Sequence, residues 1–142
     1  SLPENNIFPG ELDIPNVINV AAVGATSGLA SYSNYGVMET DVAAPGGDRG
    51  RPIYSLAPFN PRGQEFVGSG GTSMAAPIVA GIVAQILEVN PNLTPVEIKV
   101  LLMESGEDKP ALQDFVGSGK LLNALDAVER AESFSLQLVN NM

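Results

Sequence analysis

Residues 68–77, GSGGTSMAAP, constrain this chain more than any other stretch. Glycines run directly into Thr72 and Ser73, and the following residues 78–89 are apolar almost without interruption. This pattern predicts a glycine loop that turns into a helix buried on all faces, with Thr72 as the N-cap and Ser73 as the first helical residue. Pro77 would fall in the second turn, where it removes the hydrogen bond to the Ser73 carbonyl.

The predicted position of Ser73 favours a nucleophile. A residue at the start of a helix has a backbone N–H without an intrahelical partner, and the helix dipole favours negative charge there. Such a donor can hold the oxyanion that forms when the serine hydroxyl attacks a carbonyl. Gly70 and Gly71 would let a substrate backbone come close. An ordinary helix cap after a flexible turn is the alternative, and it is the commoner meaning of an isolated Gly-Thr-Ser.

Composition excludes several classes of function. The 142 residues suffice for one domain with a core, and we expect a single domain over residues 1–142. Seven basic and sixteen acidic residues give a net charge of −9, which argues against a nucleic-acid or anionic-membrane partner. The absence of cysteine and histidine excludes disulfides, thiolate metal sites and the commonest metal ligand. We see no signal peptide and no apolar run that reaches the roughly 18 residues of a membrane span.

The rest of the sequence indicates an α/β layer structure. Residues 17–25 predict a buried strand, and residues 40–47 and 51–57 predict shorter ones. Thr94, Pro95 and Glu97 form the pattern of a capping box at the start of a second helix. The core-facing residues expected in that helix are Val96, Val100, Leu101 and Met103. The further expected elements are a loop at 107–116, an amphipathic helix at 119–131 and an edge strand at 133–142.

Residues 71–81, GTSMAAPIVAG, resemble the nucleophile segment of subtilisin-like serine proteases (subtilases, peptidase family S8). The family pattern is G-T-S-M-A-x-P-x-V-A-G, and every fixed position is matched. Other segments are similar to family segments in the same order, so that the resemblance covers residues 7–131. These segments are FPGELDIPNVINVAAV (8–23), LASYSNYG (29–36, family pattern A-x-F-S-N-x-G), TDVAAPGGD (40–48) and GSGKLLNALDAV (117–128).

The resemblance implies the C-terminal half of a three-layer α/β/α subtilisin-like domain with a parallel sheet, incomplete in this chain. It implies a serine endopeptidase that acts through an acyl-enzyme on Ser73, with Gly70, Gly71 and Thr72 close to the substrate. In the family, the catalytic Asp and His and the oxyanion Asn precede the segment that begins here. Because a serine needs an adjacent base and this chain has no histidine, we expect the isolated chain to be inactive.

The same resemblance sets the expected partners and location. Protein or peptide substrates, the missing N-terminal half and self-association of the fragment are expected, outside the cell or in its envelope. No cofactor or metal is indicated, and a structural calcium ion is left open for a longer protein. In the family, the segment like Ile7-Phe8-Pro9 has a cis X-Pro bond. Ile7 would then make the floor of a substrate pocket apolar.

Several alternatives stay open. A non-catalytic subtilase-like module that binds peptides or a partner would also fit a chain without histidine, and a sedolisin-like acid protease with Glu in place of His is a third reading. A Ser–Lys dyad would need Lys99, Lys109 or Lys120 near Ser73, although all three look solvated. Asp41 and Asp48 could form a carboxylate pair or a calcium site, but loop caps are more common. Asp126 and Glu129 indicate a polar helix face.

Overall fold

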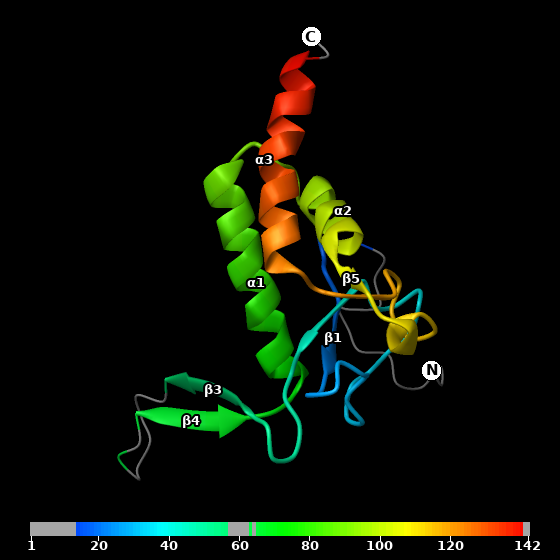
Figure 1. Ribbon diagram of the computed structural model, residues 1–142, viewed down its shortest axis with the longest axis vertical. Coiled ribbons are helices and arrows are strands. Elements are labelled where there is room, and N and C mark those ends of the chain that lie inside the picture. Colours follow the sequence, from blue (N-terminus) through cyan, green and yellow to red (C-terminus); the bar gives the residue numbers. More distant parts are fainter. Residues whose placement is uncertain (1–13, 57–62, 64, 141–142) are drawn as a thin grey trace.

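A computed structural model describes residues 14–56, 63 and 65–140 (Figure 1). Within these residues, four short strands come first, two helices follow, and two further short strands precede the last helix. In chain order the elements are β1 (Val20–Val23), β2 (Val42–Pro45), β3 (Ile53–Leu56), β4 (Phe66–Ser69), α1 (Thr72–Val89), α2 (Pro95–Ser105), β5 (Glu107–Asp108), the 3₁₀ turn η1 (Pro110–Leu112), β6 (Lys120–Leu121) and α3 (Ala124–Asn140).

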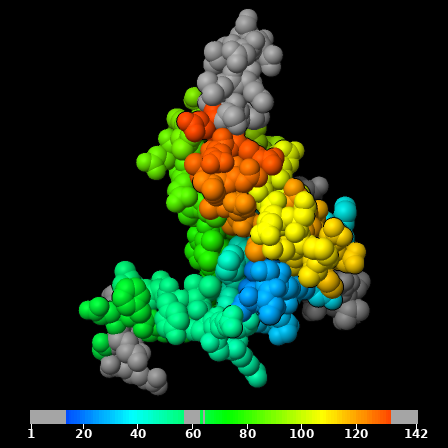
Figure 2. Space-filling view, viewed as in Figure 1, coloured from blue at the N-terminus to red at the C-terminus, as the bar shows by residue number. Residues whose placement is uncertain are grey.

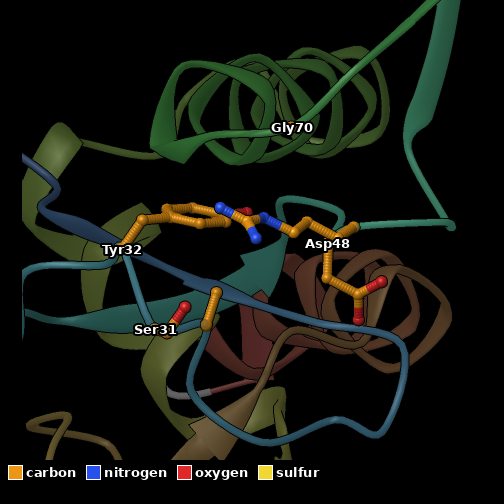
Figure 3. A pocket seen from close by; sticks show the side chains of 6 residues that line it. Ser31, Tyr32, Asp48 and Gly70 are labelled. Carbon is orange, nitrogen blue, oxygen red and sulfur yellow. The ribbon is translucent and has the colours of Figure 1, made fainter.

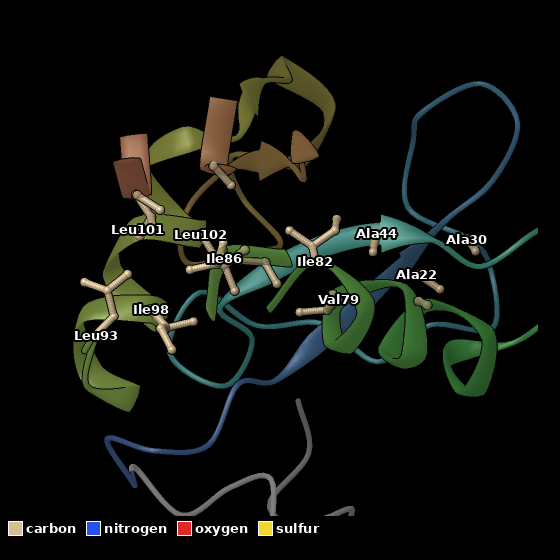
Figure 4. Packing of buried hydrophobic residues seen from close by; sticks show 14 residues of the cluster. Ala22, Ala30, Ala44, Val79, Ile82, Ile86, Leu93, Ile98, Leu101 and Leu102 are labelled. Carbon is tan, nitrogen blue, oxygen red and sulfur yellow. The ribbon is translucent and has the colours of Figure 1, made fainter. Parts of the chain in front are cut away.

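One sheet, in the order β1-β2-β6-β5, organises the described residues, with β1, β2 and β6 parallel and β5 antiparallel to β6. Side chains alternate between its two faces, as the pleat requires. Ala22 and Ala44 belong to the core beneath the helices (Figure 4), whereas Ala21 and Ala43 pack with Leu112 and residues near it on the other face. The mixed sheet with helices against it confirms the α/β class.

The outer edge of β1 is partly covered within this chain. The Ala22 N–H donates to Ser33 Oγ at 2.9 Å, and the Ala30 N–H donates to the Ala22 carbonyl at 2.9 Å. The turn after β1 therefore occupies backbone groups that an added strand would use. These hydrogen bonds leave fewer backbone groups on this edge of the sheet open to pairing with another strand.

Helix α1 packs against β1, β2 and α3 along one face (Figures 1 and 4). Its buried residues Ala75, Val79, Ile82 and Ile86 repeat at helical spacing. The expectation of burial on every face is wrong for this chain, because no described element covers the opposite face. The exposed residues of that face include Ala76, Pro77, Ala80, Gly81, Ala84 and Leu87.

No uninterrupted apolar run in the sequence reaches membrane-spanning length, but α1 as a whole reaches that length despite its few polar residues. Its 18 residues have a mean hydropathy of 1.6, enough by length and composition to cross a bilayer. The core helix of a soluble protein can meet the same criteria. Because α1 packs on a sheet through four buried side chains, we assign it to the protein core.

The second helix begins as the sequence predicts. The Glu97 N–H donates to Thr94 Oγ1 at 3.3 Å, and the Thr94 N–H donates to Glu97 Oε2 at 2.7 Å, which completes the capping box. The expected core face is shifted, because α2 buries Ile98, Leu101, Leu102 and Ser105 while Val96 and Val100 are exposed.

This capping box makes α2 sensitive to acid. The side-chain hydrogen bond from Thr94, followed by the bond from its backbone, lowers the pKa of Glu97 below the ordinary glutamate value. A lowered folded-state pKa stabilises the protein above the unfolded pKa, and this contribution is lost as pH falls through the folded value. The melting temperature, measured by circular dichroism, should fall between pH 6 and pH 3, and we expect this fall to be smaller in Glu97→Gln. Glu104→Gln, an exposed change on the same helix, is the control.

The third helix differs from its prediction at both ends. Lys120 and Leu121 form β6 instead of the first helical turn, and the Leu122 N–H donates to the Ala43 carbonyl at 2.9 Å. Asn123 then caps the helix, since its Oδ1 accepts from the Asp126 N–H at 3.2 Å. The predicted edge strand at 133–142 is wrong over residues 133–140, which continue α3. The predicted loop at 107–116 contains β5 and η1.

Strands β3 and β4 form an antiparallel hairpin that stands out from the body of the molecule (Figure 2). The pairs Tyr54↔Gly68 and Leu56↔Phe66 share one face of it. Tyr54, Leu56 and Phe66 are 69%, 70% and 58% exposed, so that this face presents apolar side chains to solvent. The sequence did not predict β4, because Gly68 lies within it and Gly70 and Gly71 follow it directly.

Candidate active site

Ser73 lies in the first turn of α1 and is exposed. Gly71, with a φ of 155°, is the N-cap, so that the helix begins at Thr72, one residue earlier than predicted. No side chain caps this end, and there is no acidic residue in the first turn. The Met74 N–H donates to the Gly71 carbonyl at 3.0 Å, which leaves the N–H groups of Thr72 and Ser73 available to an anion beside the Ser73 hydroxyl.

Gly46 fixes the loop that leads to Ser73. It follows the carboxyl end of β2, and its carbonyl accepts a hydrogen bond from the Gly71 N–H at 2.9 Å. A Cβ on Gly46 would lie 2.5 Å from Ala22 Cβ and 2.9 Å from the Gly71 carbonyl oxygen. Only glycine allows this approach, which places the glycine loop at the carboxyl ends of the parallel strands, where open α/β sheets bind ligands.

Tyr32 supports the same loop from the other side. Its hydroxyl donates to the Gly47 carbonyl. Burial raises the pKa of the Tyr32 phenol, the nearby Gly71 N–H lowers it, and the Asp48 carboxylate adds to the rise. The phenol therefore keeps its proton at neutral pH and remains a donor. The family pattern that residues 29–36 resemble has Phe at this position, which has no hydroxyl.

A hollow with a volume of about 560 Å³ opens beside the glycine loop (Figure 3). Three separate segments line it: Ala30, Ser31 and Tyr32; Asp48 and Arg49; and Gly70. Figure 3 shows the Tyr32 ring beneath the chain at Gly70, and the Asp48 carboxylate pointing away from that ring. Gly70 belongs to the glycine loop that leads to Ser73, so that this loop connects the hollow with the candidate nucleophile. Sequence reasoning missed it, since its walls are far apart in the chain.

Of the three lysines considered as a base, Lys99 is held in an ion pair. Its Nζ lies 2.8 Å from Asp41 Oδ1 and 3.0 Å from the Val17 carbonyl oxygen, with only 17% of the side chain exposed. The prediction that Lys99 is solvated is thus wrong. Asp41 also accepts from the Asn19 N–H at 2.7 Å, so that these residues tie α2 to the starts of β1 and β2.

The other two lysines also have partners of their own. Lys109 Nζ lies 2.6 Å from Glu107 Oε1. Lys120 Nζ donates to the Glu104 carbonyl at 2.8 Å and lies 4.0 Å from Asp108 Oδ1. None of these contacts involves Ser73, and the structure gives a Ser–Lys dyad no support.

The acidic residues singled out from the sequence have structural roles. Asp41 precedes β2 and Asp48 follows it, and Asp48 Oδ2 accepts from the Ala25 N–H at 2.8 Å. The two carboxylates bind different segments and do not form a pair. In the described part of the chain, no group of three or more acidic residues could hold a metal ion. Asp126 pairs with Arg130 at 3.0 Å on the surface of α3.

The remaining predicted site residues are outside the described residues or beside Ser73. Gly70, Gly71 and Thr72 form the approach to Ser73, as the sequence suggests. Ile7 and the Phe8-Pro9 bond lie outside the described residues.

Comparison with known proteins decides the family. Residues 5–119 match the Subtilase family (Peptidase S8). The chain belongs to the subtilase family. The match includes β1, β2, the glycine loop, α1 and α2, and it ends before α3 at Ala124. The expected resemblance at residues 120–131 is therefore beyond the matched range.

Curated subtilase relatives resemble this chain over most of its length. It is 39% identical over 118 residues to an extracellular protease of Xanthomonas campestris, covering 82% of this chain and 20% of the relative. It is 35% identical over 111 residues to halolysin of Haloferax mediterranei, a match that covers 78% of this chain and 20% of halolysin. The chain thus spans about a fifth of the length of these proteins.

Solved structures agree on the subtilase fold. A protease of Pseudoalteromonas arctica superposes with a TM-score of 0.74 at 37% identity, over 87% of this chain and 38% of that one. Fervidolysin of Fervidobacterium pennivorans, a keratinolytic enzyme related to subtilisin, superposes with a TM-score of 0.71 at 28% identity. This match covers 86% of this chain and 20% of fervidolysin. The described elements therefore have a subtilisin-like α/β fold and correspond to part of each of these structures.

Proposed function

We propose that this chain carries the nucleophile of a serine endopeptidase. Ser73 Oγ forms a bond to the carbonyl carbon of a peptide, and the C–N bond of that peptide breaks to leave an acyl-enzyme. A histidine takes the hydroxyl proton and passes it to the departing amine, and water then hydrolyses the ester. N–H groups at the start of α1 stabilise the oxyanion during both steps.

The observation that carries this proposal is the exposed Ser73 at an uncapped helix start within a subtilase sequence. At most helix starts, a side-chain oxygen of the N-cap residue accepts a hydrogen bond from one of the first backbone N–H groups. Here the cap is Gly71, which contributes no side-chain oxygen and leaves the donors to an external oxyanion. The Gly46–Gly71 hydrogen bond holds these donors in one position, as preorganised stabilisation requires.

The base is proposed to come from a segment that this sequence does not contain. With no histidine among the 142 residues, Ser73 has no imidazole partner within the chain. The Asp and His of the triad and the oxyanion Asn would come from the preceding part of the domain. The short coverage of the relatives supports a larger catalytic unit.

The experiment is active-site labelling of the protein encoded by the complete gene. A biotinylated fluorophosphonate should label Ser73, as identified by peptide mass spectrometry, and Ser73→Ala should remove both the label and peptide hydrolysis. Ser55→Ala, an exposed serine change in β3, is the matched control and should leave both unchanged. Labelling that persists in the Ser73→Ala protein would assign the nucleophile elsewhere.

The exposed apolar face of α1 is proposed to receive the missing half of the domain. In the isolated chain this face should instead drive self-association. We expect light scattering to give a mass above the 14.8 kDa of the monomer, increasing with concentration. Ala80→Lys and Ala84→Lys, both exposed on α1, should restore the monomer, whereas Val100→Lys on α2 should not. A concentration-independent monomer for the unmodified chain contradicts this expectation.

A non-catalytic peptide-binding module is the second candidate, favoured by the absence of histidine. Under that function the complete gene would encode no catalytic histidine, and the protein would bind peptides without cleaving them. For either function we propose a location outside the cell or in its envelope. The extracellular protease of Xanthomonas campestris supports this proposal.

A further inference from the structure

The hollow at the glycine loop combines an apolar wall with the positively charged side chain of Arg49. The ring of Tyr32 and the methyl group of Ala30 supply the apolar surface, and the Ser31 hydroxyl is an available donor. Arg49 supplies the charge, and its guanidinium makes no ion pair or hydrogen bond with any described residue. Asp48 also lines the hollow and carries a negative charge, but its Oδ2 accepts the Ala25 N–H at 2.8 Å and its carboxylate points away from the Tyr32 ring (Figure 3).

We propose that this hollow binds an acidic side chain of the substrate near the cleaved bond, and that Arg49 determines this specificity. The proposal rests on the proposed protease function and identifies the substrate class of that site. A Glu side chain has apolar methylene groups to lie on the Tyr32 ring and a carboxylate to pair with Arg49. The Ser31 hydroxyl can donate a second hydrogen bond to the same carboxylate.

The charge distribution makes this preference specific to the hollow. The chain has a net charge of −9, so that its surface as a whole repels acidic peptides. Two of its seven basic residues, Arg49 and Arg51, nevertheless fall within the turn that follows β2. Only Arg49 of these two lines the hollow. Arg51 instead continues the turn, where its N–H donates to the Asp48 carbonyl at 3.2 Å.

Tyr32 keeps the hollow in place. Its hydroxyl is bonded to the Gly47 carbonyl, and Gly47 precedes Asp48 and Arg49 in the turn. The Gly46 carbonyl in turn accepts the Gly71 N–H, so that one short segment connects the hollow with the nucleophile loop. A substrate residue held by Arg49 is thereby held at a fixed place relative to Ser73.

The test compares peptide cleavage by the protein encoded by the complete gene. Its substrates are alanine-based peptides with Glu, Gln or Lys at each position flanking the cut. We expect kcat/KM for Glu over Gln to be about twofold to fivefold higher at one position, because a partly exposed ion pair contributes modestly. Arg49→Gln should abolish this ratio, Arg49→Glu should favour Lys, and 0.5 M salt should reduce the ratio in the unmodified protein. Arg51→Gln, the matched control, should preserve it.

Failure of this inference differs from failure of the proposed function. Cleavage without a Glu preference at any position, or an equal loss in Arg51→Gln, overturns the role of Arg49 and leaves the protease intact. If the protein cleaves nothing, nuclear magnetic resonance can measure the binding of the Glu and Gln peptides to the 142-residue chain. This measurement then decides whether the hollow binds an acidic side chain. Tighter binding of the Glu peptide, with shifts at Gly70 and Tyr32 that Arg49→Gln removes, supports the hollow. Equal binding of the two peptides overturns it.

Discussion

The purified 142-residue chain is expected to hydrolyse no peptide bond and to leave Ser73 unlabelled by a fluorophosphonate. Ser73 is exposed and no side chain caps the start of its helix, but the chain contains no histidine to remove the hydroxyl proton. A serine at its free pKa is a weak nucleophile. Loss of a functional base from a serine triad lowers the rate by about 10⁴-fold or more, which places the isolated chain below ordinary detection.

The measurement is stoichiometric labelling followed by mass spectrometry, with release of a fluorogenic peptide as the second readout. The same chain, refolded with a segment that supplies the Asp, His and Asn of the family, should recover labelling at Ser73. A base within this chain, from a lysine or a carboxylate, would produce full labelling of Ser73 without any added segment. Lys99 is the first to test in that case, although its pairing with Asp41 argues against it.

The local elements of the fold could be predicted because their signals are contained in a few neighbouring residues. The capping box of Thr94 and Glu97 is such a signal, since both partners lie within one turn. The helix after Ser73 was likewise predictable from its apolar run, even though Pro77 lies within it. The family could be predicted because residues 71–81 match every fixed position of a specific motif.

Features that depend on distant contacts could not be predicted. Lys120 and Leu121 looked like the start of a helix, but they pair with β2, which lies almost eighty residues earlier in the chain. The alternating tail after Glu132 resembled an edge strand, yet it continues α3, because propensity over a few residues is a weak guide. The exposure of one face of α1 also has no local signal, because an apolar sequence predicts a buried helix whether or not a second element covers that face.

The candidate site shows the same division. Ser73 and its glycines are one continuous segment, whereas the hollow is assembled from the segments at Ala30, Asp48 and Gly70. The sequence gives no indication that the Tyr32 hydroxyl donates to the Gly47 carbonyl, because the two residues are 15 positions apart in the chain.

Gly46→Ala is expected to be among the most disruptive single substitutions in the described chain. Its new methyl group would lie 2.5 Å from Ala22 Cβ, 2.9 Å from the Gly71 carbonyl oxygen and 2.9 Å from the Tyr32 hydroxyl. Two of these neighbours are core or backbone atoms that cannot turn aside. Overpacking of this kind costs about 1–3 kcal/mol or more of the free energy of unfolding. For a chain of this size, each kcal/mol lowers the melting temperature by roughly 2–4 °C.

The same substitution should move the nucleophile, because relief of the clash requires the Gly46–Gly71 hydrogen bond to lengthen. In the protein encoded by the complete gene, we therefore expect the rate of Ser73 labelling to fall about 10²-fold. This fall should be larger than the fraction of protein unfolded at 25 °C would explain. Gly28→Ala is the matched control, since its Cβ would approach only Thr26 Oγ1, at 3.8 Å. Calorimetry and labelling kinetics measured on both variants separate the two effects. If Gly46→Ala melts and reacts as Gly28→Ala does, the contact between β2 and the nucleophile loop does not position Ser73.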